Sequence, residues 1–397
     1  MRALVRTRYG NPRDVAHVAD LPLPEPGAGQ VRVAVRAAGV DQGTVHLTTG
    51  LPLLMRLATG VRRPSKKNVP LGLDIAGVVD AIGPDVTEFA IGDEVLGFAP
   101  GGIAEFALAP VSKLIRKPVH FTFTQAAALP VSGVTALQAL RSAGILDDAP
   151  APAVLASPSG AAPAVGREGE GTPGDATEPP AVGKDGWGER GDANVPPAVG
   201  RDGNGAPDHM TEPAAGEART AKVLVVGASG GVGTFAIQLA RAAGAEVVGV
   251  CSASKASLVE GLGAKALDYA TEPLPQDHSF DAVLDIGGRN RAAALRAAAK
   301  PSGTVVMIGG EGGGRLTGGL GRQIGASLRP RRKGPRVTML MSAEKASDLT
   351  ELVDRLGEAG LEPVLDVVAP IEKGTETLAH VAAGGARGKC VVTVGEE

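Results

Sequence analysis

The fold is decided by the stretch Lys222-Val-Leu-Val-Val-Gly-Ala-Ser-Gly-Gly-Val-Gly233, which continues as Thr234-Phe-Ala-Ile-Gln-Leu-Ala240. A β-branched run leads directly into a glycine-rich turn, and the turn opens a helix. Glycines in this place allow a tight turn, let backbone N–H groups approach a pyrophosphate and let the helix pack closely on the strand. The positive end of the helix dipole also favours an anion there. The turn therefore predicts dinucleotide binding by Gly227, Ala228, Ser229, Gly230, Gly231, Val232 and Gly233, with a purely structural turn as the alternative.

Strand and helix patterns alternate on the C-terminal side of this turn. Apolar runs predict strands at 222–227, 246–251, 266–269, 281–286, 304–308 and 336–340. Helical patterns lie between them at 231–243, 254–262 and 289–300, and a further helix is predicted at 346–359. Strands buried on both faces and joined by helices indicate a doubly wound parallel sheet.

The N-terminal part has a different pattern. Short β-like runs lie between turn signals at 3–6, 30–38, 75–82, 94–97 and 104–108, followed by a helical pattern at 125–142. Val31, Val33 and Val35 alternate with polar or small residues, as in a strand with one buried face. Many short strands with glycine and proline turns favour a partly open β-barrel. The last strand-like runs, 363–368 and 388–394, are expected to complete this barrel.

Composition excludes several classes of protein. The chain has 397 residues, 43% hydrophobic and 21% charged, which fits a globular protein larger than one ordinary core. A net charge of −3 offers no strong field for nucleic acid or an acidic membrane surface. Two cysteines exclude a disulfide framework, and no apolar run approaches the ~18 residues of a membrane span. We therefore expect a cytoplasmic protein with a small-molecule substrate.

One segment, 147–220, differs from the rest. Glycine and proline make up 24 of its 74 residues, and a Pro-Ala-Val-Gly unit recurs every 17 residues at Pro163, Pro180 and Pro197. Each unit offers too little apolar surface to offset the entropy of ordering the chain. We predict a disordered, low-complexity insert, with a functional docking segment as the alternative.

The choice between cofactors is predicted from the end of the second strand. NAD-binding turns of this kind carry an acidic residue about 20 residues further on, which holds the ribose 2′-hydroxyl. This sequence has Cys251-Ser-Ala-Ser-Lys255 there. No carboxylate would repel a 2′-phosphate, and Ser252, Ser254 and Lys255 can donate hydrogen bonds to one. NADPH is therefore predicted over NADH, although the serines could instead cap the following helix.

No metal site is predicted. The six histidines show no paired spacing, and two cysteines cannot form a multi-cysteine zinc site. The prediction for metal ligands is therefore none.

Ten segments, in order along the chain, carry a resemblance to a known family. They are Tyr9-Gly-Asn-Pro, Leu23-Pro-Glu-Pro-Gly-Ala-Gly-Gln-Val-Arg-Val, Gly72-Leu-Asp-Ile-Ala-Gly-Val-Val, Gly83-Pro-Asp-Val-Thr, Gly92-Asp-Glu-Val-Leu-Gly, Ala127-Ala-Leu-Pro, Gly133-Val-Thr-Ala-Leu-Gln-Ala-Leu, the Gly227 turn, Leu262-Gly-Ala and Ala386-Arg-Gly-Lys-Cys-Val-Val. Outside the insert, the chain resembles the zinc-free quinone oxidoreductase branch, also called zeta-crystallin-like, of the medium-chain dehydrogenase/reductase superfamily.

The resemblance implies a fold and further site residues. It implies a GroES-like, partly open β-barrel domain at 1–122, completed by 364–397, and a Rossmann domain at 123–363 with the insert inside it. Thr135 matches a threonine near the nicotinamide, and Tyr269 an element near the adenosine. Asp41 stands where the branch has an Asn, so it is a candidate catalytic residue or a turn former. Ile308 and Gly309, at the end of a predicted strand, are further candidate cofactor-binding residues.

The resemblance also implies an activity. Zinc-dependent relatives have Gly-His-Glu where this chain has Gly72-Leu73-Asp74, and a ligand cysteine near the position of Asp41. The implied reaction is a zinc-independent hydride transfer from NADPH to a quinone or an α,β-unsaturated carbonyl. The alternative is an NADPH-binding adaptor that acts through partner binding with little turnover. A homodimer is left open.

Overall fold

The computed structural model describes residues 1–65, 70–147, 220–310, 314–319, 321 and 334–395. The predicted disordered insert at 147–220 therefore lies, except for its two end residues, outside the described residues. The described residues all belong to one compact unit. Within the described residues, no helix is both long and apolar enough to cross a membrane.

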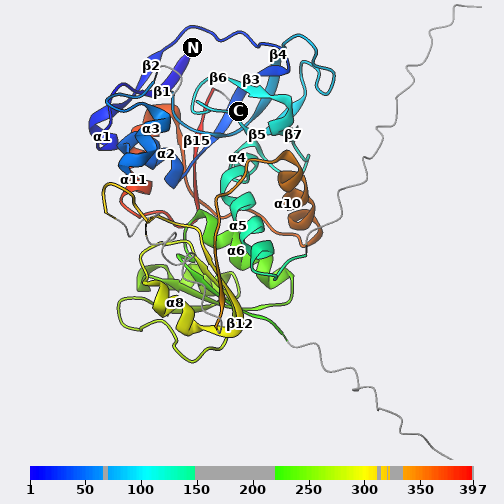
Figure 1. The fold of residues 1–397 in the computed structure, drawn as a ribbon. Helices are drawn as coiled ribbons and strands as arrows, with labels where there is room; N and C mark the ends of the chain where they lie inside the picture. Colours follow the sequence, from blue (N-terminus) through cyan, green and yellow to red (C-terminus); the bar gives the residue numbers. More distant parts are fainter. Residues whose placement is uncertain (66–69, 148–219, 311–313, 320, 322–333, 396–397) are drawn as a thin grey trace, which may run out of the picture. The chain divides into compact units, whose positions relative to one another are not determined.

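The first sheet is mostly antiparallel and holds both N-terminal and C-terminal strands (Figure 1). Its order is β14-β15-β3-β4-β5-β7, with β6 paired to β3. The strands are β3 (Gln30–Val40), β4 (Asp74–Ile82), β5 (Glu94–Phe98), β6 (Phe106–Pro110), β7 (Leu114–Arg116), β14 (Leu365–Pro370) and β15 (Lys389–Thr393). A two-stranded sheet of β1 (Arg2–Arg6) and β2 (Ala16–Asp20) accompanies it. β15 runs antiparallel to β3, with Cys390 opposite Val40.

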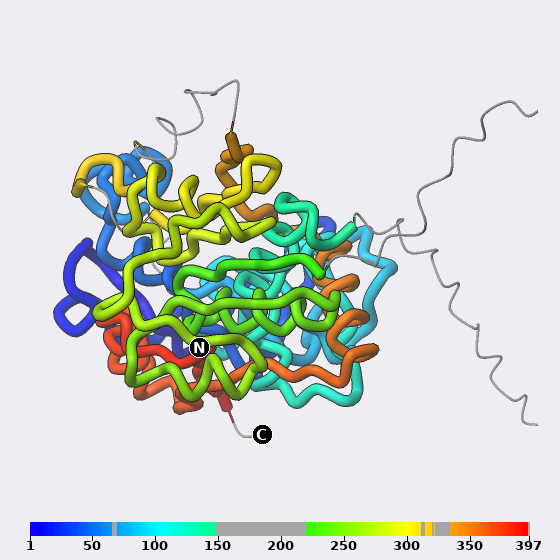
Figure 2. The backbone as a smooth tube through the Cα atoms, turned by 90° about the horizontal axis from the view of Figure 1, so that it is seen from below, coloured from blue at the N-terminus to red at the C-terminus, as the bar shows by residue number. Residues whose placement is uncertain are grey.

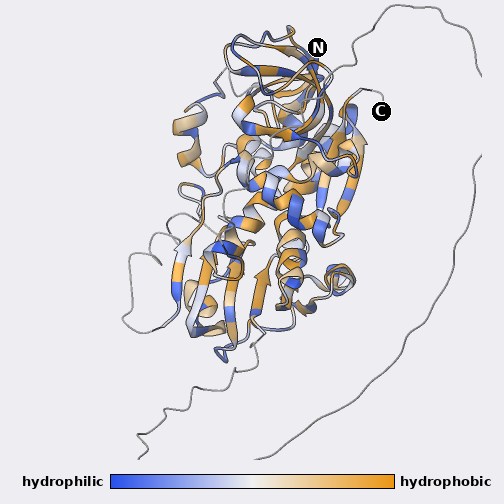
Figure 3. Ribbon diagram, turned by 90° about the vertical axis from the view of Figure 1, so that its right-hand side faces the viewer, coloured by the Kyte–Doolittle hydropathy of each residue, from blue (hydrophilic) through white to orange (hydrophobic). Residues whose placement is uncertain are grey.

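The second sheet has six parallel strands in the order β10-β9-β8-β11-β12-β13. The green-to-yellow part of the chain, which holds most of these strands, lies together in Figure 2. Its strands are β8 (Lys222–Val226), β9 (Glu246–Cys251), β10 (Lys265–Asp268), β11 (Phe280–Asp285), β12 (Ala299–Met307) and β13 (Arg336–Met339). Apolar residues run along these strands (Figure 3), and Val223, Leu224 and Val225 of β8 are fully buried. The predicted fold class, a GroES-like domain with a Rossmann parallel sheet, is confirmed.

Most of the helices fall into two groups. Those near the first sheet are α1 (Pro12–Val15), α2 (Gln42–Thr49), α3 (Arg56–Thr59), α4 (Phe123–Ala127) and α11 (Gly374–Ala382). Those near the parallel sheet are α6 (Gly231–Ala242), α7 (Ala256–Gly261) and α8 (Ala292–Ala298). Two further helices lie between these groups: α5 (Pro130–Ser142) packs on α6, β4 and β5, and α10 (Ala346–Glu358) packs on α5 and β7. One cluster of buried apolar side chains includes residues of α4, α5, α6, α10 and β8, so the two sheets share part of their core.

Two predicted helices differ in length from the structure. The pattern at 125–142 is divided into α4 and α5, because Pro130 has no N–H to continue the hydrogen bonds of α4. The helix predicted at 289–300 covers only Ala292–Ala298. It ends there because Ala299 already pairs with Phe280 of β11.

Candidate active site

Two adjoining cavities lie at the carboxyl ends of β8, β9 and β11. The smaller has a volume of about 350 Å³ and the larger about 800 Å³, both within the usual range for ligand pockets. Gln42, Ile286, Val381 and Gly384 line both, so the cavities are continuous. The carboxyl edge of a doubly wound sheet is where ligands bind in this architecture.

The glycine-rich turn separates β8 from α6 and contributes to both cavities. Gly227 has φ +88, a conformation that glycine adopts without strain. A Cβ on Gly233 would lie 2.3 Å from the carbonyl oxygen of Gly227, and one on Gly231 would lie 2.9 Å from Oγ of Ser132. Gly227 and Ser229 line the larger cavity, and Gly231 and Val232 the smaller. The glycines of the turn therefore allow close packing, and four residues of the turn face the two cavities.

Three other residues of the predicted turn do not line either cavity. These are Ala228, Gly230 and Gly233. Gly230 forms a bridge with Gly388, and the N–H of Gly388 donates to the carbonyl of Ser229 at 2.9 Å. The structure thus gives these positions a packing role, which brings the turn against the loop before β15.

The predicted 2′-phosphate residues gather in the larger cavity. Ser252, Ser254 and Lys255 all line it, and the two serine hydroxyls lie 3.2 Å apart. Ser252 begins the 3₁₀ helix Ala253–Lys255 but makes no side-chain capping bond. Its hydroxyl is therefore not used for the capping role that the sequence left open.

Two cations lie at this end of the larger cavity. Nζ of Lys255 donates to the carbonyls of Gly384 at 2.8 Å and Ala386 at 2.7 Å, and burial lowers the pKa of its ammonium group. The guanidinium of Arg387 donates to the carbonyl of Ser254 at 2.6 Å. Sequence reasoning missed Arg387, which lies 132 residues beyond Lys255 but belongs to the quoted Ala386-Arg-Gly-Lys segment.

Asp41 lies between β3 and α2, where it caps a helix and faces a cavity. Its Oδ1 accepts from the N–H of Thr44 at 2.8 Å and from the hydroxyl of Thr44 at 3.0 Å, so it caps α2. Asp41 also lines the smaller cavity, together with His46.

The other candidates are divided between the cavities and the core. Tyr269, 66% exposed, lines the larger cavity, and Ile308 and Gly309 line the smaller. Thr135 lies in α5 with 6% exposure, and its hydroxyl donates to the carbonyl of Val131 at 2.6 Å. Thr135 lines neither cavity. Val131 and Ser132, one turn earlier, form the wall there.

A buried ion pair lies beside the smaller cavity. Nζ of Lys389 is 2.7 Å from Oδ2 of Asp74, and the side chains are 2% and 0% exposed. Oδ1 of Asp74 accepts from the N–H of Val131 at 3.0 Å. Burial raises the pKa of Asp74 to about 6, against the opposing effect of Lys389. Burial acts to lower the pKa of Lys389, but the carboxylates of Asp74 and Asp41 outweigh it and the pKa is raised.

Comparison with known proteins places this site in a family. The family "Alcohol dehydrogenase GroES-like domain" matches residues 27–119, and "Zinc-binding dehydrogenase" matches residues 262–392. The chain is 25% identical to a chloroplast envelope quinone oxidoreductase homolog of Arabidopsis thaliana, over 99% of this chain and 98% of the relative. It is 28% identical to the mitochondrial NAD(P)H oxidoreductase RTN4IP1 of Mus musculus, over 99% and 89%.

Solved structures share the fold. The quinone oxidoreductase from Coxiella burnetii has a TM-score of 0.69 at 22% identity, covering 100% of this chain and 99% of that one. Mycobacterial Rv1454c, solved in complex with NADPH, has a TM-score of 0.67 at 21% identity, covering 99% and 100%. The chain belongs to the quinone oxidoreductase branch of the medium-chain dehydrogenase/reductase superfamily, a class of oxidoreductases. The resemblance expected from its motifs is thereby confirmed.

Proposed function

We propose that this protein is an NADPH-dependent oxidoreductase that reduces a quinone or an α,β-unsaturated carbonyl without a catalytic zinc ion. The observation that carries the proposal is the pair of continuous cavities, in which the glycine turn and the Ser252–Lys255 segment adjoin a smaller, mainly apolar chamber. The names of the relatives, quinone oxidoreductase and NAD(P)H oxidoreductase, support it. A nicotinamide cofactor bound there would supply the hydride.

We assign the larger cavity to the adenosine and pyrophosphate of the cofactor. Gly227 and Ser229 would face the pyrophosphate, and Tyr269 the adenosine. Ser252, Ser254 and Lys255 would hold the 2′-phosphate, with Arg387 as an additional cation. The hydroxyls there bond to each other and not to helix N–H groups, which leaves them able to turn toward a phosphate.

We assign the smaller cavity to the substrate and the reacting end of the cofactor. Where zinc-dependent relatives have a ligand cysteine and a His-Glu pair, this chain has Asp41 and the Leu73-Asp74 pair. Leu73 offers no ligand atom, and the carboxylates of Asp41 and Asp74 are already engaged. Asp41 caps α2, and Asp74 pairs with Lys389 inside the protein. The carbonyl oxygen of the substrate would be polarised by backbone N–H groups and hydroxyls such as that of Ser132. Such weak polarisation suits an acceptor that is already activated, such as a quinone or an enone.

Asp41 and Thr135 keep a proposed role in the reaction, but each acts by shaping or supporting the wall of the smaller cavity. Because one carboxylate oxygen of Asp41 accepts two bonds from Thr44, its contribution is to shape the wall between β3 and α2. Thr135 acts through the turn of α5 that presents Val131 and Ser132 to the cavity.

The test is NADPH oxidation by the purified protein with a panel of quinones and enones, and with saturated ketones and primary alcohols as controls. We expect turnover with activated acceptors only, and faster turnover with NADPH than with NADH. Tight NADPH binding without turnover on any acceptor would favour the adaptor alternative. A cytoplasmic location and a homodimer complete the proposal, to be checked by fractionation and by sedimentation, since the named relatives include chloroplast and mitochondrial proteins.

A further inference from the structure

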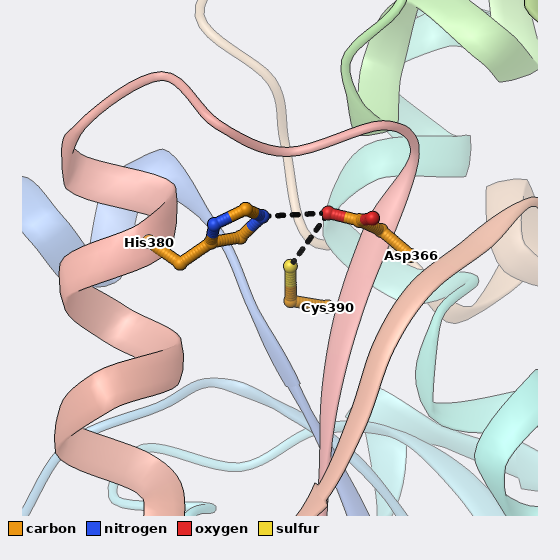
Figure 4. Close-up of side chains that lie close together, drawn as sticks. All are labelled: Asp366, His380 and Cys390. Carbon is orange, nitrogen blue, oxygen red and sulfur yellow. Dashed lines mark hydrogen bonds and ion pairs between the residues drawn. The ribbon is translucent and has the colours of Figure 1, made fainter.

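Three chemically reactive side chains meet at one end of the first sheet (Figure 4). Asp366 comes from β14, His380 from α11 and Cys390 from β15. Nε2 of His380 lies 2.7 Å from Oδ2 of Asp366, and Sγ of Cys390 lies 3.8 Å from the same oxygen. The three potential ligand atoms all lie within 4.8 Å of one another.

The backbone explains why Asp366 faces the other two residues. β14 and β15 are parallel, with Leu365 opposite Lys389 and Val367 opposite Cys390. Asp366 is therefore an extra residue in β14, and a bulge of this kind redirects a side chain out of the regular alternation. The N–H of Arg387 donates to Oδ2 of Asp366 at 3.0 Å and fixes the carboxylate.

A thiol, an imidazole and a carboxylate are the donor types that zinc binds in proteins. Zinc lies about 2.0–2.3 Å from such ligands, so tetrahedral ligands lie roughly 3.3–3.6 Å apart. The separation of Cys390 and Asp366 is close to that range, and that of His380 and Asp366 is shorter. The side chain of His380 would have to move by roughly 0.6–0.9 Å to reach that range, which its 38% exposure allows. The same exposure gives a metal ion an entry path and leaves a fourth position for water.

The thiol of Cys390 belongs to the same cluster as the pair of His380 and Asp366, because Sγ donates to Oδ2 of Asp366. Cys390 is 1% exposed, and burial raises its pKa to about 11, so the thiol is protonated in the free protein. A bound divalent cation displaces that proton, and the thiolate and the carboxylate then balance its two positive charges. Among the described residues, the cations near the cluster include Lys255, Arg387 and Lys389. Lys255 and Arg387 direct their side chains to backbone carbonyls, and Lys389 pairs with Asp74.

We propose that Asp366, His380 and Cys390 bind a divalent cation of the zinc class, at a site separate from both cavities. This site is also distinct from Asp41 and the Leu73-Asp74 pair, which stand at the ligand positions of zinc-dependent relatives. Sequence spacing predicted no metal ligands because the three residues lie 10 to 24 positions apart and come from three elements. A bound ion ties β14, α11 and β15 together around the loop that carries Gly384 and Ala386, whose carbonyls hold Lys255.

The test is titration of the full-length, chelator-treated protein with Co²⁺. Coordination by Cys390 gives a thiolate-to-cobalt charge-transfer band and intense tetrahedral ligand-field bands, at one ion per chain. Cys390→Ser abolishes the charge-transfer band, and His380→Ala weakens binding more than tenfold. The matched controls are Cys251→Ser, which changes the only other cysteine, and His17→Ala, which changes an exposed histidine on β2. Both controls keep the band and the affinity.

A second measurement guards against a misfolded variant. Zn²⁺ should raise the melting temperature of the wild type and of His17→Ala, but not that of His380→Ala, whose folding is verified by circular dichroism. The proposal is overturned if the wild type shows no charge-transfer band at saturating Co²⁺. It is equally overturned if Cys390→Ser and His380→Ala bind Co²⁺ as tightly as the wild type, because the ion is then adventitious.

Discussion

Lys389 lines the smaller cavity and also forms an ion pair in the protein interior. Its ammonium group pairs with Asp74 inside the protein, and its aliphatic chain lies against Gly231 at the start of α6, where a Cβ would be 3.0 Å from Cδ of Lys389. The nearby carboxylate of Asp41 acts to raise the pKa of both Asp74 and Lys389. Lys389 thus lies against the glycine turn, pairs with the first residue of β4 and is close enough to feel the charge of Asp41, which caps α2.

Removing Lys389 leaves a buried carboxylate without its partner. We expect Lys389→Met to lower the free energy of unfolding by about 3–5 kcal/mol at pH 8, as for other broken buried pairs. The control is Lys222→Met, which removes a half-exposed pair with Glu246 and should cost at most about 1 kcal/mol. Urea unfolding followed by circular dichroism measures both.

The loss of unfolding free energy in Lys389→Met should change with pH in one direction. The folded-state pKa of Asp74, about 6, is above its ordinary value of 3.8. Its contribution to stability is therefore fully present below pH 3.8 and is lost as the pH rises through 6. Because Lys389 lowers this pKa, Lys389→Met raises it further, and the cost of the variant should shrink as the pH falls from 8 toward 5. A cost that is constant over this range would contradict an ionised Asp74.

Lys255 tests the preference for NADPH. A charge-assisted hydrogen bond to the 2′-phosphate contributes about 1.5–3 kcal/mol, so Lys255→Ala should weaken NADPH binding about tenfold to a hundredfold. NADH lacks that phosphate and should lose far less, through the freed carbonyls of Gly384 and Ala386 alone. Fluorescence titration measures both affinities, and Lys265→Ala on β10 is the control. Equal losses for the two cofactors would assign Lys255 a structural role only.

At the scale of elements, the contact between α6 and β8 depends on Gly233. A Cβ there meets backbone atoms of Gly227 and Ala228 at 2.3–2.6 Å, which only a shift of α6 can relieve. We expect Gly233→Ala to cost about 1–3 kcal/mol of stability and to weaken NADPH binding. The matched control, Gly261→Ala in α7, has open space around its Cβ and should be neutral or slightly stabilising. Denaturant midpoints and NADPH titration compare the two variants.

Elements whose pattern is local could be predicted from the sequence. The alternation of Val31, Val33 and Val35 gave β3, and the apolar run before the glycine turn gave β8 and α6. The division into α4 and α5 was missed, because the helical periodicity continues across Pro130 while the backbone hydrogen bonds do not. Helix α8 was predicted too long because the pairing of Ala299 with Phe280 is a tertiary contact.

Contacts between distant residues in the site could not be read from spacing. Ser252, Ser254 and Lys255 could be named as candidates because a glycine turn has its ribose-binding position at a fixed distance along the chain, and all three line the larger cavity. The pair of Asp74 and Lys389 spans 315 residues, and the return of β15 to the first sheet creates it. No local pattern encodes such a pair.

At the scale of the whole molecule, the C-terminal part of the chain joins the first sheet to the glycine turn. β15 pairs with β3, and the loop before it meets the glycine turn through the bridge of Gly388 and Gly230. That arrangement places Lys389 beside the smaller cavity and Arg387 near the larger one. The C-terminal part of the chain therefore supplies Lys389 and Arg387 to the region of the two cavities.

This arrangement predicts how turnover responds to metal removal. Because Asp41 and the Leu73-Asp74 pair stand at the ligand positions of zinc-dependent relatives, and both carboxylates are engaged, NADPH oxidation with a quinone should be unchanged after chelation. Chelation should still lower the melting temperature if an ion is held by Asp366, His380 and Cys390. Elemental analysis before and after treatment measures the zinc content, and Cys390→Ser separates the two sites. That variant lacks the second site, so its turnover should be the same with and without chelator.

Loss of turnover in both proteins, regained when zinc is returned, would show a catalytic metal and overturn the zinc-free mechanism. Loss in the wild type alone would place the effect at the Cys390 site and leave that mechanism intact.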